Sequence, residues 1–209
     1  MLKILGRANS INVQKALWVA EECGLSYDRS DVGGAFGGND QPWYRALNPN
    51  GVIPTIDDDG YILWESNSIV RYLAAKHSAG NLWPSDPQVR GHADRWMDWQ
   101  LSTIQNGMRD LFWGWTRTPP EQRNLAALEA ARVATAGIWQ RLDAHLATRA
   151  FVAGDQFTMG DIPVGAMGHR WFALDLRRDD LPPLVHMRAW YERLLTRPAY
   201  KKVVALPLT

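Results

Sequence analysis

Residues 48–73, which read NPNGVIPTIDDDGYILWESNSIVRYL, decide the fold class. Turn-forming residues at 48–51 precede two short apolar segments, 53–56 and 61–64, which flank the sequence DDDG at 57–60. Two apolar segments joined by an Asp-Gly turn are typical of an antiparallel hairpin. We therefore predict a pair of antiparallel strands here.

The residues on either side of this hairpin supply two more strands and three helical segments. In chain order we predict a strand over Met1–Leu5, a helix from Asn12 that stops at Gly24, a strand over Ser26–Val32, a helical turn over Pro42–Leu47 and, after the hairpin, a helix capped by Ser66. The order strand, helix, strand, helical turn, strand, strand, helix indicates a small α/β sheet and not a full doubly wound domain.

Beyond a proline-rich linker at 82–87, every apolar period is helical. We predict one long helix or a broken pair over Val89–Trp115, a helix opened by Pro119-Pro120 that runs to about Thr148, one from Thr158, and one after Pro182-Pro183 that ends near Arg197. The expected fold is α/β plus all-α, with a first domain over 1–80 and an all-helical domain over 88–209.

Composition excludes several classes of function. The 209 residues carry 23 basic and 22 acidic side chains, and this balance argues against nucleic-acid or anionic-membrane binding. The single Cys23 excludes a disulfide framework, and the five histidines show no metal-ligand spacing. We find no signal peptide and no apolar run near the ~20 residues of a membrane span, so we expect a cytoplasmic protein without a metal.

The segment Ser10–Lys15 (SINVQK) lies where the first strand leads into the first helix. Helix N-termini present unpaired N–H groups and favour negative charge, so the Ser10 hydroxyl is placed to donate to an anion over the helix end. Ser10 or Asn12 is equally suited to be an ordinary cap of that helix. Position alone leaves both interpretations open.

Two further pairs suit the ends of a peptide-like ligand. A cis bond at Ile53-Pro54 would turn the Ile53 backbone outward as a template for an extended peptide, although an ordinary edge proline is the commoner case. Glu65 can meet an ammonium group, and Ser66, at a helix start, can meet a carboxylate. The pair therefore suits a zwitterionic amino-acid head.

Two helical segments carry residues that suit purely structural packing or capping, and the first of them has a functional alternative. Met108, Phe112, Trp113 and Trp115 either belong to the core or line an apolar pocket for a hydrophobic ligand, since both have this composition. Thr158–Asp161 forms a capping box, which is a structural device.

Five motifs occur in a characteristic order. They are Ser10-x-Asn12-x-x-Lys15, Asn48–Pro54 (NPNGVIP), Leu63–Leu73 (LWESNSIVRYL), the box Thr158–Asp161, and Trp190–Leu194 (WYERL) followed by Arg197–Tyr200 (RPAY). On these motifs the chain resembles the cytosolic glutathione transferase family from end to end, and looks most like bacterial theta-related members with an active-site serine.

The resemblance implies a thioredoxin-like first domain that binds glutathione and a helical second domain that supplies the electrophile pocket. It places Ser10 as the catalytic serine, with Asn12 as a second candidate donor to the thiolate. Ile53 and a cis Pro54 then pair with the cysteinyl unit of glutathione, and Glu65 with Ser66 holds its γ-glutamyl end. Glutathione is the co-substrate, and no cofactor is expected.

The chain departs from the family at Val52, where a basic residue often contacts the glycine carboxylate of glutathione. Gln41, Asn39 or a residue of the glycine-rich loop Gly33–Gly38 is a possible substitute. We expect the second substrate to be a small hydrophobic electrophile. Its pocket is placed at six residues whose packing the sequence does not show: Phe36, Met108, Phe112, Trp113, Trp115 and Phe172.

The resemblance also leaves other activities open. A non-catalytic binding module and a glutathione-dependent dehalogenase or lyase are alternatives, whereas Ser10 disfavours thiol-disulfide reduction because serine forms no mixed disulfide. Relatives are usually homodimers, and the tryptophan-rich helix from Ala93 to Trp115 is a natural contributor to that interface.

Overall fold

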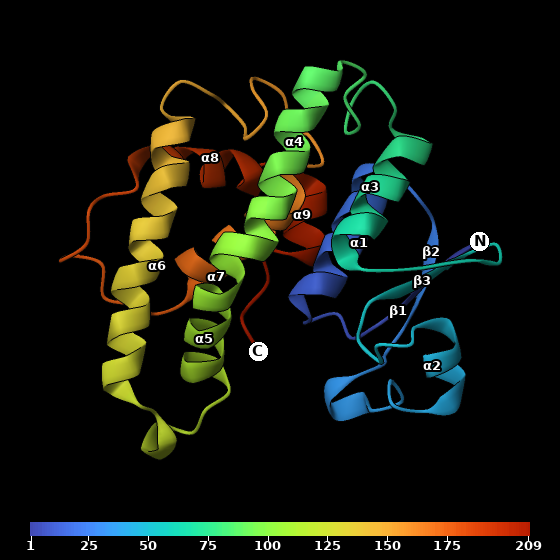
Figure 1. The fold of residues 1–209 in the computed structure, drawn as a ribbon, viewed down its shortest axis with the longest axis horizontal. Helices are drawn as coiled ribbons and strands as arrows, with labels where there is room; N and C mark the ends of the chain where they lie inside the picture. The colour runs from blue at the N-terminus through green and yellow to red at the C-terminus, as the bar shows by residue number, and fades with distance from the viewer.

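The computed structural model describes residues 1–209 and has an α/β part followed by an all-helical part (Figure 1). The elements of the first part are β1 (Leu2–Leu5), α1 (Ile11–Glu22), β2 (Tyr27–Ser30), a 3-10 turn (Gly34–Phe36), α2 (Pro42–Leu47), β3 (Thr55–Asp58), β4 (Tyr61–Trp64) and α3 (Ser66–His77). Its sheet has the order β2-β1-β3-β4, with β1 parallel to β2 and antiparallel to β3. The predicted thioredoxin-like domain and the all-helical domain after it are confirmed.

The second part contains helices and no strand. Its elements are α4 (Pro87–Trp99), a π-helical segment (Gln100–Ile104), α5 (Gln105–Thr116), a 3-10 turn (Pro120–Gln122), α6 (Leu125–Leu146), α7 (Asp161–Ala173), α8 (Val185–Leu195) and α9 (Pro198–Val203). None of these helices combines the length and apolar composition that crossing a bilayer requires.

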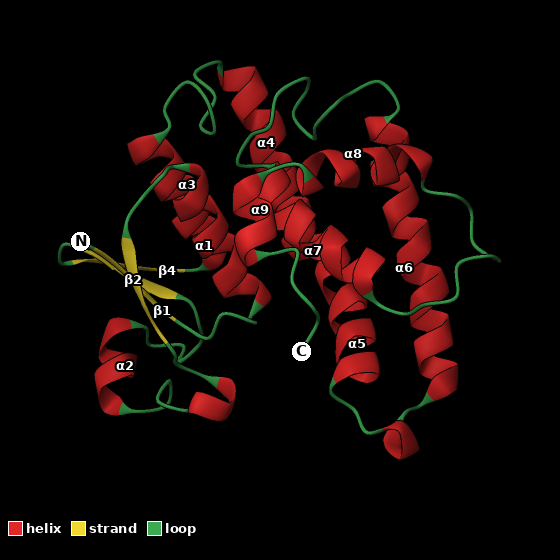
Figure 2. Cartoon of the chain, turned by 180° about the vertical axis from the view of Figure 1, so that it is seen from behind, coloured by secondary structure: helices red, strands yellow, loops and turns green.

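Helices α1 and α3 lie between the sheet and the helical domain, while α2 lies apart from them (Figure 2). Helix α1 packs on α3 on one side and on α7 and α9 on the other. It is therefore buried on nearly every face, including its polar residues Gln14 and Lys15. The polar start of α1 is held rigidly at the junction of the two domains.

Tryptophan accounts for much of this packing. Trp18, Trp139, Trp171 and Trp190 are all fully buried, and the ring of Trp18 lies 4.5 Å from that of Tyr200. Large aromatic rings contribute much buried apolar area per residue. The unusual count of 11 tryptophans thus serves mainly the core of the helical domain and its junction with α1.

Three predicted boundaries are wrong for local reasons. β3 continues to Asp58, so only Asp59 and Gly60, both at positive φ, form the hairpin turn. The helix placed at Pro119-Pro120 begins at Leu125, because the Asn124 side chain accepts the N–H of Ala127 and caps it there. The helix placed at Thr158 begins at Asp161.

Of the two alternatives for Val89–Trp115, the structure has the broken pair, α4 and α5. The break itself is a π-helical segment, which was not predicted and is a feature often found at functional sites. The chain also adds α9 after Arg197, where Pro198 starts a new helix instead of only ending the previous one.

Candidate functional site

The N-terminus of α1 presents a free hydroxyl to a cavity of about 180 Å³. Ser10 occupies the N-cap position, and its carbonyl accepts the N–H of Gln14 at 2.8 Å. Its side chain makes no capping hydrogen bond, so the capping interpretation is wrong for the hydroxyl. Ser10 and Asn12 both line the cavity. The hydroxyl therefore stands at the positive end of a helix with no partner in the chain.

The N-terminus of α3 meets that of α1. The Ser66 hydroxyl donates to Oδ1 of Asn12 at 3.3 Å, so the two residues link the helix starts. Ser66 is the first residue of α3 and does not cap it; Glu65 occupies the N-cap position, again without a side-chain bond. Glu65 is exposed and has φ +70°, a backbone conformation that costs a non-glycine residue energy and often occurs at functional sites.

Between α1 and α3 in the chain, the backbone of Ile53 is unpaired. The Ile53-Pro54 bond is cis. Neither the N–H nor the C=O of Ile53 takes part in a hydrogen bond, whereas the Val52 carbonyl accepts from Tyr44 and Asn48, each at 2.8 Å. The Ile53 backbone is therefore available to an extended peptide, as the cis interpretation of the motif requires.

Val52 and its two possible side-chain substitutes, Asn39 and Gln41, differ in their availability to a glycine carboxylate. The Val52 side chain is half exposed and apolar. The Asn39 amide donates to the carbonyl of Gly51 at 2.7 Å and so holds its own loop. Gln41 is exposed and contacts only Asp40, at 3.3 Å, which leaves it the freer of the two polar side chains.

A fully buried lysine lies beneath the two helix starts. Nζ of Lys15 is 2.8 Å from Oε1 of Gln100, 3.3 Å from Oδ1 of Asn67 and 3.4 Å from Oγ of Ser66, with no carboxylate among its partners. Gln100 belongs to the π-helical segment and donates to Gln105, which lines the cavity. This network joins α1 and α3 to the helical domain.

The environment of Lys15 disfavours its charge. The pKa of Lys15 falls to about 7. Burial is the largest cause and the positive charge of Arg170 the second, while the charge of Glu65 acts in the opposite direction. In the unfolded chain a lysine titrates near ~10.4. Below pH 7 the folded protein therefore bears a buried ammonium, and as pH rises towards 10 the unfolded state binds more protons and the native state gains stability.

Replacing this ammonium tests that electrostatic cost. We expect Lys15→Met to stabilise the protein by about 1–2 kcal/mol at pH 6, because an apolar side chain of similar volume removes a buried charge without a counter-ion. Urea unfolding at pH 6 and pH 9 measures the effect, which shrinks at the higher pH. Lys201→Met, on an exposed residue, is the control and stays within about 0.5 kcal/mol of the parent. A destabilised Lys15→Met at pH 6 would contradict this assignment.

The structure does not gather the predicted electrophile-pocket residues in one place. Of the six, only Trp113 lines the cavity with Ser10. Phe36 lines a neighbouring cavity of about 200 Å³, which shares Arg7 and Arg117 with the first. Trp115 lines a third cavity, with Arg123.

The other three residues belong to packed layers. Met108 and Phe112 are fully buried. Phe172 packs on Tyr191, with ring centroids 4.7 Å apart, and under Arg188. An apolar stripe on a helix serves the core when a neighbouring helix covers it, and α5 is covered by α6 and α7.

Sequence reasoning missed most of the lining of the Ser10 cavity, including all four of its arginines. The remaining lining of the Ser10 cavity comprises Arg7, Ile11, Gln105, Arg109, Arg117, Met167 and Arg170. A charged residue within a strongly apolar helix was the available signal, since Arg170 follows the buried run Asp161–His169 on α7 and Lys15 lies within the apolar face of α1. Such charges are rarely buried without a purpose.

Comparisons with known proteins agree with this architecture. Residues 9–76 match the family model for the glutathione S-transferase N-terminal domain, and residues 126–193 match that for the C-terminal domain. The chain is 40% identical to glutathione S-transferase GstB of Escherichia coli, over all of both chains. It is 29% identical to glutathione S-transferase 3 of Zea mays, over 99% of this chain and 95% of the relative.

A solved structure is similar over the whole chain. The theta class glutathione S-transferase of Xanthomonas axonopodis pv. citri, solved with glutathione bound, has a TM-score of 0.95 and 51% identity, over 100% of this chain and 99% of that one. Both halves of the chain match in order, and the relatives are matched at full length. The protein therefore belongs to the glutathione S-transferase family.

Proposed function

We propose that this protein is a glutathione S-transferase that ionises the thiol of glutathione at the N-terminus of α1 and adds the sulfur to an electrophile. The observation that carries the proposal is the unpartnered Ser10 hydroxyl at that helix end, facing a cavity between the two domains. The glutathione-bound relative at 51% identity supports glutathione as the co-substrate.

The energetic requirement is modest. A free cysteine thiol titrates near ~8.5, and lowering its pKa by ~2 units requires about 2.7 kcal/mol of preference for the thiolate. A hydrogen bond to a charged group contributes ~1.5–3 kcal/mol and a helix N-terminus ~0.3–1 kcal/mol. Ser10 and the α1 dipole together meet this requirement. Ser10 donates a hydrogen bond and keeps its own proton, while the thiol proton leaves to solvent. Asn12 is the second candidate donor.

The rest of glutathione is assigned to groups of the first domain. The Ile53 backbone, beside cis Pro54, pairs with the cysteinyl unit. The γ-glutamyl carboxylate lies at the start of α3 and accepts from the Ser66 hydroxyl, which gives up its weak bond to Asn12 on binding, while the ammonium meets Glu65. Gln41 takes the glycine carboxylate in place of a basic residue at Val52. The first domain, over 1–80, would bind glutathione, and the second, over 88–209, would bind the electrophile.

Two measurements test the function together. Retention on immobilised glutathione reports binding, and turnover of 1-chloro-2,4-dinitrobenzene with glutathione reports transfer. Binding with turnover supports a transferase, and binding without turnover of this and other electrophiles points to the non-catalytic module. If millimolar glutathione neither binds nor shifts the melting temperature, the proposal is wrong.

Ser66 is expected to act on binding and not on chemistry. Ser66→Ala should raise the KM for glutathione about tenfold, because one hydrogen bond to a charged carboxylate is lost. The value of kcat should change little, since the bond is present in the ground state and the transition state alike. Ser68→Ala, on the same helix, is the control. An equal fall in kcat and kcat/KM for Ser66→Ala would instead place Ser66 at the sulfur.

Two family properties extend the proposal. We infer a homodimer in which the helix from Ala93 to Trp115 contributes to the interface, because Leu101 leaves apolar surface exposed on it. A solution mass near one chain, 23.6 kDa, would contradict the dimer. We also infer a cytoplasmic location, where glutathione is abundant and reduced.

A further inference from the structure

The cavity at Ser10 is strongly basic. Four of its ten lining residues are arginines, and no acidic side chain lines it. Arg7 comes from the corner after β1, Arg109 and Arg117 from α5 and its C-terminal end, and Arg170 from α7. Elements of both domains therefore bring guanidinium groups to the place where we position the sulfur.

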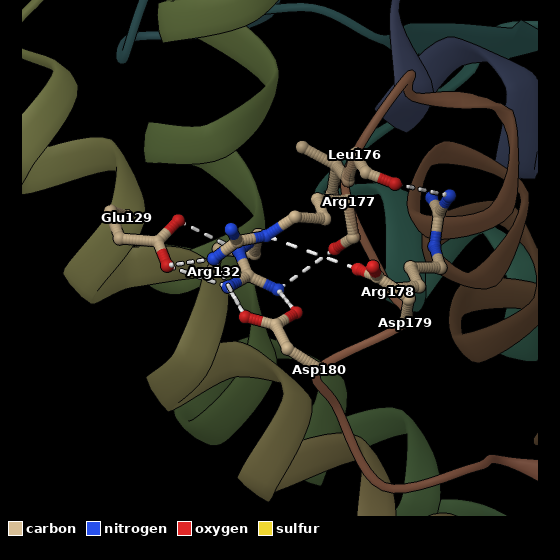
Figure 3. Close-up of polar contacts among 7 residues, drawn as sticks. All are labelled: Glu129, Arg132, Leu176, Arg177, Arg178, Asp179 and Asp180. Carbon is tan, nitrogen blue, oxygen red and sulfur yellow. Dashed lines mark hydrogen bonds and ion pairs between the residues drawn. The ribbon is translucent and has the colours of Figure 1, made fainter.

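Arg170 has no partner in the chain although it is only 8% exposed. Its guanidinium lies 3.7 Å from the ring centroid of Phe112 and makes no hydrogen bond or ion pair. The other deeply buried arginine, Arg132, is bound differently. Figure 3 shows its guanidinium between the carboxylates of Glu129 and Asp180, at 2.6 and 2.7 Å. Buried charges are normally paired in this way, so Arg170 is an exception that requires an explanation.

Arg7 and Arg117 are also without carboxylate partners. Nη1 of Arg7 donates to the Asn9 amide oxygen at 2.5 Å, and its Nε is buried with no acceptor. Arg117 stacks over the rings of Phe112 and Trp113, at 5.2 and 5.5 Å, and makes no ion pair. The fourth arginine, Arg109, pairs with Asp110 at the surface.

Three unpaired guanidinium groups at one cavity oppose each other. Burial and, after it, the charges of Arg117 and Arg7 together lower the pKa of Arg170 to about 9. The pKa of Arg7 is also lowered, by burial and then by Arg117. An anion in the cavity would reverse these effects, because opposite charge favours the charged guanidinium. The lining therefore has the electrostatics of an anion site.

We propose that the electrophile transferred to glutathione carries a carboxylate or a similar oxyanion, bound by Arg7, Arg117 and Arg170 beside the sulfur at Ser10. This inference rests on the proposed transferase function and names its substrate class. The planar fork of arginine matches a carboxylate in two hydrogen bonds. The cavity volume of about 180 Å³ is close to the ~150 Å³ of a protein cavity that binds benzene, so it suits a small organic anion.

The tripeptide itself does not account for this cavity. None of residues 52–54 and 65–66, where we place the glutathione backbone and γ-glutamyl end, lines it. Three of the four arginines belong to the helical domain, which approaches the sulfur from the other side. The anion that these arginines bind is therefore assigned to the second substrate.

Matched electrophiles that differ only in charge provide the test. We choose 4-(chloromethyl)benzoate and 4-(chloromethyl)benzamide. In each, the glutathione sulfur forms a C–S bond to the benzylic carbon, chloride leaves with the electron pair of the C–Cl bond, and the thiol proton goes to solvent. After subtraction of the uncatalysed rate, kcat/KM for the benzoate should exceed that for the benzamide by about tenfold or more, as one bound charge warrants.

Variants connect this preference to the arginines. Arg170→Met should lower the ratio of benzoate to benzamide rates about tenfold, mainly by raising the KM for the benzoate. Arg117→Gln, at an exposed position where misfolding is not expected, should lower it in the same direction. Arg141→Met, an exposed arginine of α6, removes the same charge elsewhere and should leave the ratio unchanged.

Each other outcome overturns one specific step. Equal rates on both probes in the parent protein overturn the anion proposal and leave the transferase standing. If Arg170→Met and Arg117→Gln raise the KM for glutathione with both probes and leave the ratio of benzoate to benzamide rates unchanged, the arginines bind the carboxylates of glutathione. That result also overturns the anion proposal. Failure to bind glutathione or turn over either probe overturns the proposed function itself.

Discussion

Ser10→Ala should lower kcat/KM by up to about 100-fold near neutral pH, because one hydrogen bond to the sulfur, at ~1.5–3 kcal/mol, is lost. The pKa of the bound thiol should rise by about 1–2 units, towards ~8.5. The ultraviolet absorbance of the thiolate, titrated in the binary complex with glutathione, measures that shift directly. The deficit in rate should shrink as pH rises above the pKa of the free thiol, since ionisation then needs no assistance.

Controls separate this role from a structural one. The Ser10 side chain makes no capping bond, so Ser10→Ala should leave the melting temperature nearly unchanged. Ser26→Ala, at an exposed serine, should leave rate and thiol pKa as in the parent. An unaltered thiol pKa in Ser10→Ala would transfer the role to Asn12 or to the N–H groups of α1, and Asn12→Ala then decides between these two.

The elements that sequence predicted well are those with local causes. The hairpin depends on Asp59 and Gly60, which adopt positive φ, and α2 depends on Pro42 at its first position. The boundaries that failed depend on contacts of single side chains. Asn124, for example, starts α6 several residues after the prolines that seemed to open it. Periodicity reports an apolar face and does not report such caps.

The candidate site also contains residues that local motifs predict and residues that only the fold brings to it. Residues 10–12, 53–54 and 65–66 occur in short motifs, and the Ser66–Asn12 hydrogen bond joins the first and the last of these at two helix starts. The four arginines at the cavity share no motif, since Arg7 and Arg170 are separated by more than 160 residues in the chain. The one available signal was the charge of Arg170 within the otherwise apolar helix α7. The aromatic residues could not be assigned to a pocket from sequence, because core and pocket walls share one composition. Only packing shows that Phe112 lies beneath a guanidinium.

The box at Thr158–Asp161 is predictable from sequence, but the structure shows why it matters more than an ordinary cap. The Asp161 carboxylate is fully buried and accepts from the N–H groups of Thr158 and Val152, each at 3.0 Å, and from Nε1 of Trp190 at 2.9 Å. It thus joins the start of α7, the loop before it and α8. Burial raises the pKa of Asp161 to about 6, and these donors, which stabilise the anion, limit the rise.

Asp161→Ala should destabilise the protein by about 4–6 kcal/mol, because three buried donors lose their acceptor at ~1–3 kcal/mol each. This is comparable with the whole stability of many domains, ~5–15 kcal/mol, so we expect largely insoluble or unfolded protein. Asp161→Asn keeps one acceptor oxygen for Val152 and Trp190 but presents its own N–H₂ to the N–H of Thr158, and should lose less. Asp155→Ala, at an exposed position nearby, is the control. Urea unfolding ranks the three variants. If Asp161→Ala is no less stable than Asp155→Ala, the Asp161 carboxylate is not a main stabilising acceptor of the fold.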